Sequence, residues 1–137
     1  MKKIFSSAYN LVLIDISILI MRVSVSALMI VHGKQKFNKL ITTEDISFQD
    51  PLGIGEVPSL ILVVFAELVC SILVIIGLAT RLALVPLIIT MIIAAFVIHG
   101  NHAFGKQELP YLYLIIYTAL FFTGPGKFSL DRVISKK

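Results

Sequence analysis

The residues that could carry chemistry are a few ionisable side chains within long apolar stretches of the sequence. Arg22 and Glu67 each lie near the middle of such a stretch, whereas His32, His99 and Glu108 lie near the ends of others. In apolar surroundings such groups are costly, so they pair, line a cavity or act on protons. An imidazole can also hydrogen-bond a quinone carbonyl or bind a metal. These residues are therefore the first candidates for a functional site.

The composition shows what surrounds these residues. Of the 137 residues, 58% are apolar and 15% are charged, and the mean hydropathy is +0.97. A soluble domain carries about 25% charged residues, so this composition excludes a soluble globular enzyme and a disordered chain. The single cysteine, Cys70, excludes an internal disulfide and a cysteine-based metal site. The sequence therefore indicates an integral membrane protein, and its length allows one domain.

Four apolar stretches are long enough, or nearly so, to cross a bilayer as helices. We predict one all-α membrane domain over 1–137, with four transmembrane helices in an antiparallel bundle. A tight connector at 77–81 joins the second and third helices, and Gly124-Pro125-Gly126 ends the fourth. A longer, partly ordered loop follows the first helix and is expected to hold an interfacial helix or re-entrant piece. The predicted spans are 11–31, 58–78, 82–99 and 109–123.

Lysine and arginine residues predict the orientation. One side of the membrane collects seven of them and the other collects four, so the positive-inside rule places both termini in the cytoplasm. These charges are expected to meet lipid headgroups. Since no basic stripe contains interleaved aromatic residues, nucleic acid is not an expected partner. The larger group is Lys2, Lys3, Arg81, Lys127, Arg132, Lys136 and Lys137, and the smaller is Lys34, Lys36, Lys39 and Lys106.

The depth of the charged residues predicts an ion pair. Neighbouring helices run in opposite directions in the predicted bundle, which places both Arg22 and Glu67 near the midplane. We therefore predict an Arg22–Glu67 ion pair there, with a structural role in helix register as the alternative. Asp15 is expected to cap the end of the bundle beside Arg81, at the same membrane level.

A second polar group is expected at the outer mouth of the bundle. It combines with the predicted pair into one candidate site for a small polar ligand such as a quinone. A haem between His32 and His99 is disfavoured, because the sequence has no second histidine pair and no CxxCH motif. No metal site is predicted, and the structural alternative is a set of hydrated interfacial residues. The candidate residues are Arg22, His32, Lys36, Glu67, His99 and Glu108.

Aromatic and capping residues complete the local predictions. Tyr111, Tyr113 and Tyr117 are expected to form an interfacial belt at the start of the fourth span. Ser129 is expected to cap a short helix that begins at Leu130.

Several short motifs, taken in order, resemble those of the DoxX-like family. Arg22 followed by HGKQK at 32–36 matches the family's R…HGxxK opening. FAE at 65–67 is similar to its helix-borne glutamate, and GLATR at 77–81 to its GLxTR connector. His99-Gly100 is similar to the end of its third helix. GPGKFSLD at 124–131 resembles its closing GPGxYSLD, with Phe128 in place of the usual Tyr. The resemblance covers nearly the whole chain.

The resemblance implies a four-helix protein of the prokaryotic inner membrane. The family takes its name from relatives in an archaeal thiosulfate:quinone oxidoreductase, and other members are associated with membrane redox complexes. A redox-linked, quinone-facing subunit is therefore the leading hypothesis, acting with a partner redox protein or as a homo-oligomer. Whether the chain is itself an enzyme stays open. So do two alternatives: a non-catalytic scaffold that anchors a soluble redox enzyme, and a small transporter or proton path that uses Glu67.

Overall fold

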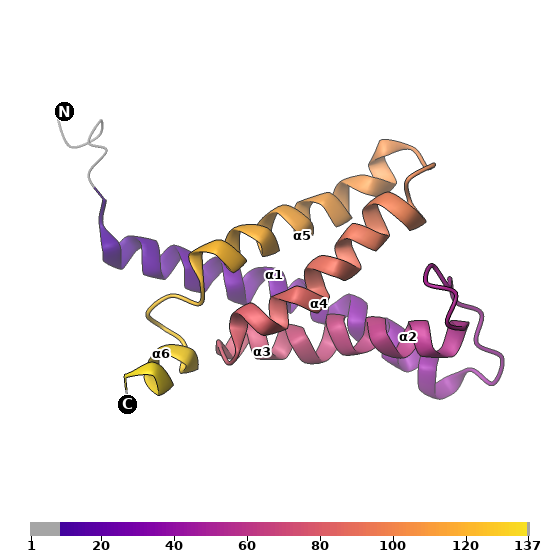
Figure 1. The fold of residues 1–137 in the computed structure, drawn as a ribbon, viewed down its shortest axis with the longest axis horizontal. Helices are drawn as coiled ribbons and strands as arrows, with labels where there is room; N and C mark the ends of the chain where they lie inside the picture. The colour runs from indigo at the N-terminus through magenta and orange to yellow at the C-terminus, as the bar shows by residue number, and fades with distance from the viewer. Residues whose placement is uncertain (1–8, 137) are drawn as a thin grey trace.

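In the computed structural model, which describes residues 9–136, the chain is helical and no strand occurs between these residues. Two segments are π-helical and continue the α-helices before them, so several labels belong to one longer rod (Figure 1). We number the rods in chain order: the first is 11–42, the second 56–76, the third 80–98 and the fourth 104–123. The elements are α1 (Leu11–Thr42), α2 (Glu56–Val64), η1 (Phe65–Cys70), α3 (Ser71–Ile76), α4 (Thr80–Ile92), η2 (Ile93–Ile98), α5 (Phe104–Thr123) and α6 (Leu130–Ser135).

Among the described residues, three helical stretches are long and apolar enough to cross a membrane: Leu11–Thr42, Glu56–Ile76 and Thr80–Ile98. α5 has 20 residues, but its first turns carry Lys106 and Glu108, which lower its hydropathy. Large apolar side chains such as Ile115, 64% exposed, cover the outer surfaces of the rods. Such exposure is stable in lipid and not in water. The chain is a multi-pass membrane protein.

α1 is longer than predicted, because the helix expected to end at residue 31 continues to Thr42. The loop after it, 43–55, contains no helix, so the expected interfacial helix is absent, and a re-entrant piece stays a prediction. The carboxylate of Asp50 orders the end of this loop by accepting hydrogen bonds from the Gly55 amide (2.7 Å) and the Ser59 hydroxyl (2.8 Å). Hydrogen bonds from Ser59 and Gly55 hold the pKa of Asp50 below its usual value.

The turn between α3 and α4 forms where the glycine motif predicts it. The amides of Gly77 and Leu78 both donate to the carbonyl of Leu73, which closes the end of α3. Gly77 has a φ of +72°, a conformation that glycine adopts without steric cost. The chain therefore leaves α3 in a short turn and starts α4 at Thr80.

The buried core lies between two groups of helices. α1 packs along α2, η1 and α3, and α4 packs mainly against α5 (Figure 1). Tyr113 and Tyr117 belong to this core, with their rings stacked at a centroid distance of 6.0 Å. The predicted tyrosine belt is therefore wrong for these two residues. They are spaced by one helical turn, which places both on the inward face of α5.

Candidate functional site

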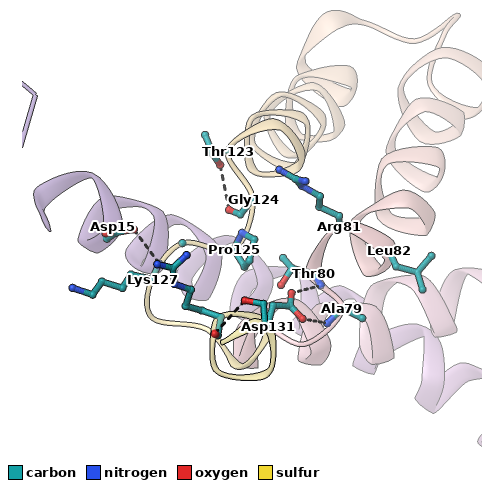
Figure 2. A pocket seen from close by; sticks show the side chains of 13 residues that line it. Asp15, Ala79, Thr80, Arg81, Leu82, Thr123, Gly124, Pro125, Lys127 and Asp131 are labelled. Carbon is teal, nitrogen blue, oxygen red and sulfur yellow. Dashed lines mark hydrogen bonds between the residues drawn. The ribbon is translucent and has the colours of Figure 1, made fainter. Parts of the chain in front are cut away.

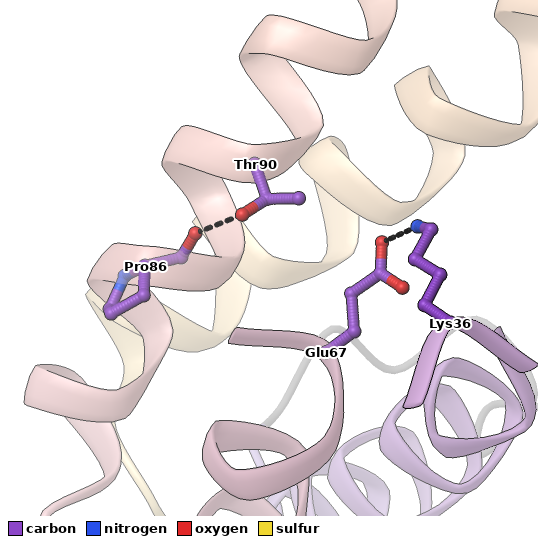
Figure 3. Close-up of polar contacts among 4 residues, drawn as sticks. All are labelled: Lys36, Glu67, Pro86 and Thr90. Atoms are coloured by element: carbon purple, nitrogen blue, oxygen red, sulfur yellow. Dashed lines mark hydrogen bonds and ion pairs between the residues drawn. The ribbon is translucent and has the colours of Figure 1, made fainter. Parts of the chain in front are cut away.

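Glu67 lies on η1, the π-helical segment in the middle of the second long rod. π-Helical turns occur frequently at functional sites. The Glu67 side chain is buried, and its Oε1 accepts a hydrogen bond from the ammonium group of Lys36 on α1 (Figure 3). The other carboxylate oxygen, Oε2, is buried and has no hydrogen-bond partner within 9–136. Glu67 thus has one charged partner and one acceptor oxygen left free.

The predicted Arg22–Glu67 ion pair is wrong, because the two helices pack in a different register. Glu67 lies opposite Gly33, where an added Cβ would fall 2.9 Å from the backbone carbon of Glu67. Arg22 lies about 16 Å farther down α1 at 1.5 Å per residue, at the level of Gly77. The prediction counted depth from the ends of the apolar stretches. Since α1 continues beyond its apolar stretch, the midpoints of the two stretches do not face each other.

Arg22 instead holds a C-terminal segment, residues 124–131, which we call the clasp. The buried guanidinium donates to the carbonyl oxygens of Pro125 (2.6 Å) and Phe128 (2.7 Å). Ser129 caps α6 by accepting from the Arg132 amide, which confirms the predicted cap. Arg22 therefore has a structural partner at the clasp and lines no cavity beside Glu67.

Two aspartates tie the clasp to the helices around it (Figure 2). Asp131 accepts from the amides of Ala79 (2.7 Å) and Thr80 (2.9 Å), and Asp15 accepts from the Lys127 amide (2.9 Å). Burial raises the pKa of Asp131, but hydrogen bonds from Thr80 and Ala79 outweigh it and leave this pKa below its usual value. The closing motif of the chain thus joins α1, α4 and α6.

Two cavities meet at Glu67. The larger, of about 440 Å³, lies between the loop after α1, the second rod and the third rod, and its walls are mostly apolar. Phe48, Leu62, Phe65 and Ile89 are among those walls. The smaller, of about 220 Å³, lies between α1, η2 and α5. Both cavities are lined by Lys36, Glu67, Ala94 and His99.

The two histidines of the site contribute unequally. His99 ends η2, and its Nδ1 is buried without a hydrogen-bond partner within 9–136. His32 lines only the smaller cavity, where its ring packs edge-on against Tyr113 at a centroid distance of 6.1 Å. His99 is thus the histidine with a free polar atom at the junction of the cavities.

Four of the six predicted site residues line these cavities, and two do not. His32, Lys36, Glu67 and His99 are brought together, whereas Arg22 lies at the clasp. Glu108 is exposed and lines neither cavity. The structure therefore does not bring Glu108 together with the other candidates, since the inward face of α5 is the one that carries Tyr113.

Sequence reasoning missed several residues that line the site, among them Lys106, Tyr113 and Thr90. Lys106 and Tyr113 line the smaller cavity, and Thr90 lines the larger. The Thr90 hydroxyl donates to the Pro86 carbonyl one turn earlier (2.8 Å; Figure 3). The spacing from Lys106 to Tyr113 is two helical turns, so reading α5 from Phe104 onward would have placed both residues on one face.

The chemistry of the site is that of an apolar cavity with one polar end. Lys36 is a donor, the free oxygen of Glu67 is an acceptor, and the imidazole of His99 can be either. Among residues 9–136, no group of three or more histidine, cysteine or acidic side chains is placed to hold a metal ion. The site suits a small, mainly apolar molecule that carries a polar oxygen.

Comparisons with known proteins find the family that the motifs resemble. The family described as DoxX matches residues 17–100. An "Uncharacterized protein" of Haemophilus influenzae is 34% identical over 124 residues, covering 85% of this chain and 90% of its own length. "Putative oxidoreductase CatD" of Bacillus subtilis is 34% identical over 125 residues, covering 89% of this chain and 90% of its own length. No solved structure matches.

Proposed function

The chain belongs to the DoxX family, and on this premise we propose that it is a redox-associated membrane subunit that binds a quinone ring beside Glu67. One observation carries the proposal. Two buried polar atoms without partners within 9–136, Oε2 of Glu67 and Nδ1 of His99, lie where an apolar cavity meets a polar end. The name of the Bacillus subtilis relative supports an oxidoreductase context.

The cavity matches the two requirements of a quinone. Its apolar walls can cover the faces of a ring, and a few polar groups can fix its orientation, as in most small-molecule sites. Lys36 and His99 can donate hydrogen bonds to a carbonyl oxygen, and Glu67 can hold a proton next to it. A quinone takes up two electrons and two protons to become a hydroquinone. The chain's own residues would bind the ring and supply protons, and a partner redox protein would supply the electrons.

We further propose that α5 is the fourth span and that the four rods form an antiparallel bundle in a prokaryotic inner membrane. The start of α1 and α6 lie toward the same end of the molecule (Figure 1). Arg81, Lys127 and Arg132 surround one cavity at that end. This arrangement supports a cytoplasmic location for both termini under the positive-inside rule.

Titration with a quinone tests the proposed function. The purified protein in detergent would be titrated with a short-chain, water-soluble quinone analogue and followed by calorimetry. Removing one partner of a hydrogen bond that involves a charged group costs about 1.5–3 kcal/mol. We therefore expect Glu67→Gln and His99→Gln each to raise the Kd about tenfold or more. Glu108→Gln is the matched control, because Glu108 is exposed and lines neither cavity, and its Kd should equal that of the unaltered protein.

Two outcomes would contradict the proposal. One is no measurable quinone binding by the folded protein. The other is equal affinity in Glu67→Gln, His99→Gln and Glu108→Gln. Failure to bind a quinone, together with a soluble redox enzyme that co-purifies with the chain, would favour the scaffold alternative.

Buried hydroxyl groups favour a proton path as a second candidate function. Ser26, Ser71 and Tyr117 are fully buried, and they lie one helical turn from Arg22, Glu67 and Tyr113 respectively. They place hydroxyls between the level of Glu67 and the clasp. Vesicles containing the chain alone would be loaded with a pH-sensitive dye. A proton leak that Glu67→Gln abolishes and Glu108→Gln leaves unchanged would support this function, and no leak would exclude it.

A further inference from the structure

A third cavity, drawn in Figure 2, lies at the clasp. The Lys36–Glu67 ion pair lies farther along α1, toward its other end. The volume of the third cavity is about 590 Å³. It is lined by Asp15 of α1, by the first turn of α4, by the end of α5 and by the clasp and α6. Neither the proposed quinone site nor the proton path uses it.

The basic side chains around this cavity are free of carboxylate partners. Arg81, Lys127 and Arg132 line it, and no salt bridge involves any of them within residues 9–136. The two carboxylates of the cavity, Asp15 and Asp131, accept hydrogen bonds from backbone amides instead. Three cations therefore face two carboxylates that are already hydrogen-bonded, and the cavity has an excess of positive charge.

The surroundings of the cavity place it near lipid. Thr80, Arg81 and Leu82 form the first turn of α4 and line the cavity, and the amides of Ala79 and Thr80 at this helix start already donate to Asp131. The apolar side chains of Leu82 and Phe122 are 74% and 75% exposed at this level. Exposed apolar side chains beside arginines are typical of the boundary between hydrocarbon and headgroups.

We propose that this cavity binds the phosphate group of an anionic ligand, through Arg81, Lys127 and Arg132. Basic pockets between transmembrane helices bind anionic lipid headgroups in this way. The position of the cavity at the boundary of the apolar surface makes a phospholipid headgroup the source that its geometry favours. A soluble phosphate offers the same chemistry, and the experiment separates the two.

Binding of a short-chain phosphatidylglycerol to the detergent-solubilised full chain tests this site. Short-chain phosphatidylcholine and inorganic pyrophosphate are the parallel probes. A lysine or arginine near a charged surface contributes about 1 kcal/mol, which corresponds to a factor of about five in affinity. We expect Arg81→Gln and Arg132→Gln each to weaken phosphatidylglycerol binding about fivefold. Lys34→Gln, which removes an exposed charge at the other end of α1, is the matched control and should have no effect.

The outcomes decide between the sources and the proposal itself. Binding of phosphatidylglycerol but not phosphatidylcholine, with the expected variant pattern, supports a lipid headgroup. The same pattern with pyrophosphate alone supports a soluble phosphate. The proposal is overturned if neither anion binds or if Lys34→Gln weakens binding as much as the arginine variants. Because Arg81 also contacts the Phe122 carbonyl (3.5 Å), Arg132→Gln keeps the test decisive should Arg81→Gln fail to fold.

Discussion

The contact between Gly33 and Glu67 yields a quantitative prediction for Gly33→Ala. An added Cβ would lie 2.9 Å from the backbone carbon of Glu67 and 2.9 Å from the amide nitrogen of Leu68. Both are backbone atoms of a neighbouring rod, so they cannot rotate away as a side chain can. Relaxing these contacts to 3.5 Å requires α1 and η1 to separate by about 0.6 Å.

The expected magnitude follows from two opposing terms. Alanine is favoured over glycine inside a helix by about 0.5–1 kcal/mol. Overpacking of a close contact costs about 1–3 kcal/mol. Gly105→Ala supplies the matched control, because Gly105 is also helical and its added Cβ would meet nothing within 4 Å. The difference in unfolding free energy between the two variants should therefore equal the overpacking cost, with Gly33→Ala the less stable by about 1–3 kcal/mol.

Denaturation of both variants in the same detergent, titrated with sodium dodecyl sulfate and followed by circular dichroism, measures this difference. Equal unfolding free energies for Gly33→Ala and Gly105→Ala would refute the register described for α1 and η1. A more stable Gly33→Ala variant would refute it as well. Since this register places Lys36 beside Glu67, such a result would also remove the geometric basis of the quinone site.

Two further predictions concern the clasp. Asp131→Asn should lower stability near neutral pH by about 1–2 kcal/mol, as for the loss of a helix cap. Because the folded-state pKa of Asp131 is lowered, its contribution is present above about pH 4 and is lost as the pH falls through the folded-state value. The stability gap between variant and unaltered protein should therefore close in acid, and a constant gap from pH 7 to 3 would contradict this. Arg22→Leu removes two charged hydrogen bonds to Pro125 and Phe128, a loss of about 3 kcal/mol. It should speed tryptic cleavage after Lys127, measured by mass spectrometry, and an unchanged rate would count against the clasp.

The features that the sequence predicts correctly are those fixed by local chemistry. The Gly77 turn and the Ser129 cap depend on residues within a few positions of each other. Membership of the DoxX family followed from the order of short motifs. The grouping of Lys36 with Glu67 was predicted only as a shared site, since the bond between them depends on how the rods pack.

The features that were missed depend on register. An apolar stretch marks the part of a helix that can lie in lipid, but it does not mark where the helix ends. α1 runs on to Thr42, and the close approach at Gly33 sets its position against η1. A buried arginine therefore could not be assigned its partner from depth alone. Arg22 donates to backbone carbonyls of the clasp. Because every residue has a backbone carbonyl, the residue types in the sequence do not reveal which one accepts the bond.

The clasp also determines when, during synthesis, Arg22 can make its hydrogen bonds. Arg22 and its acceptor at Pro125 are separated by 103 residues, which a ribosome needs roughly 5–20 s to add. During that interval the guanidinium of Arg22 lacks the two carbonyl acceptors that it has in the folded protein. The bonds between α1 and the clasp can therefore form only after residues 125–128 have been made, and a chain truncated before the clasp leaves the Arg22 guanidinium without these two acceptors.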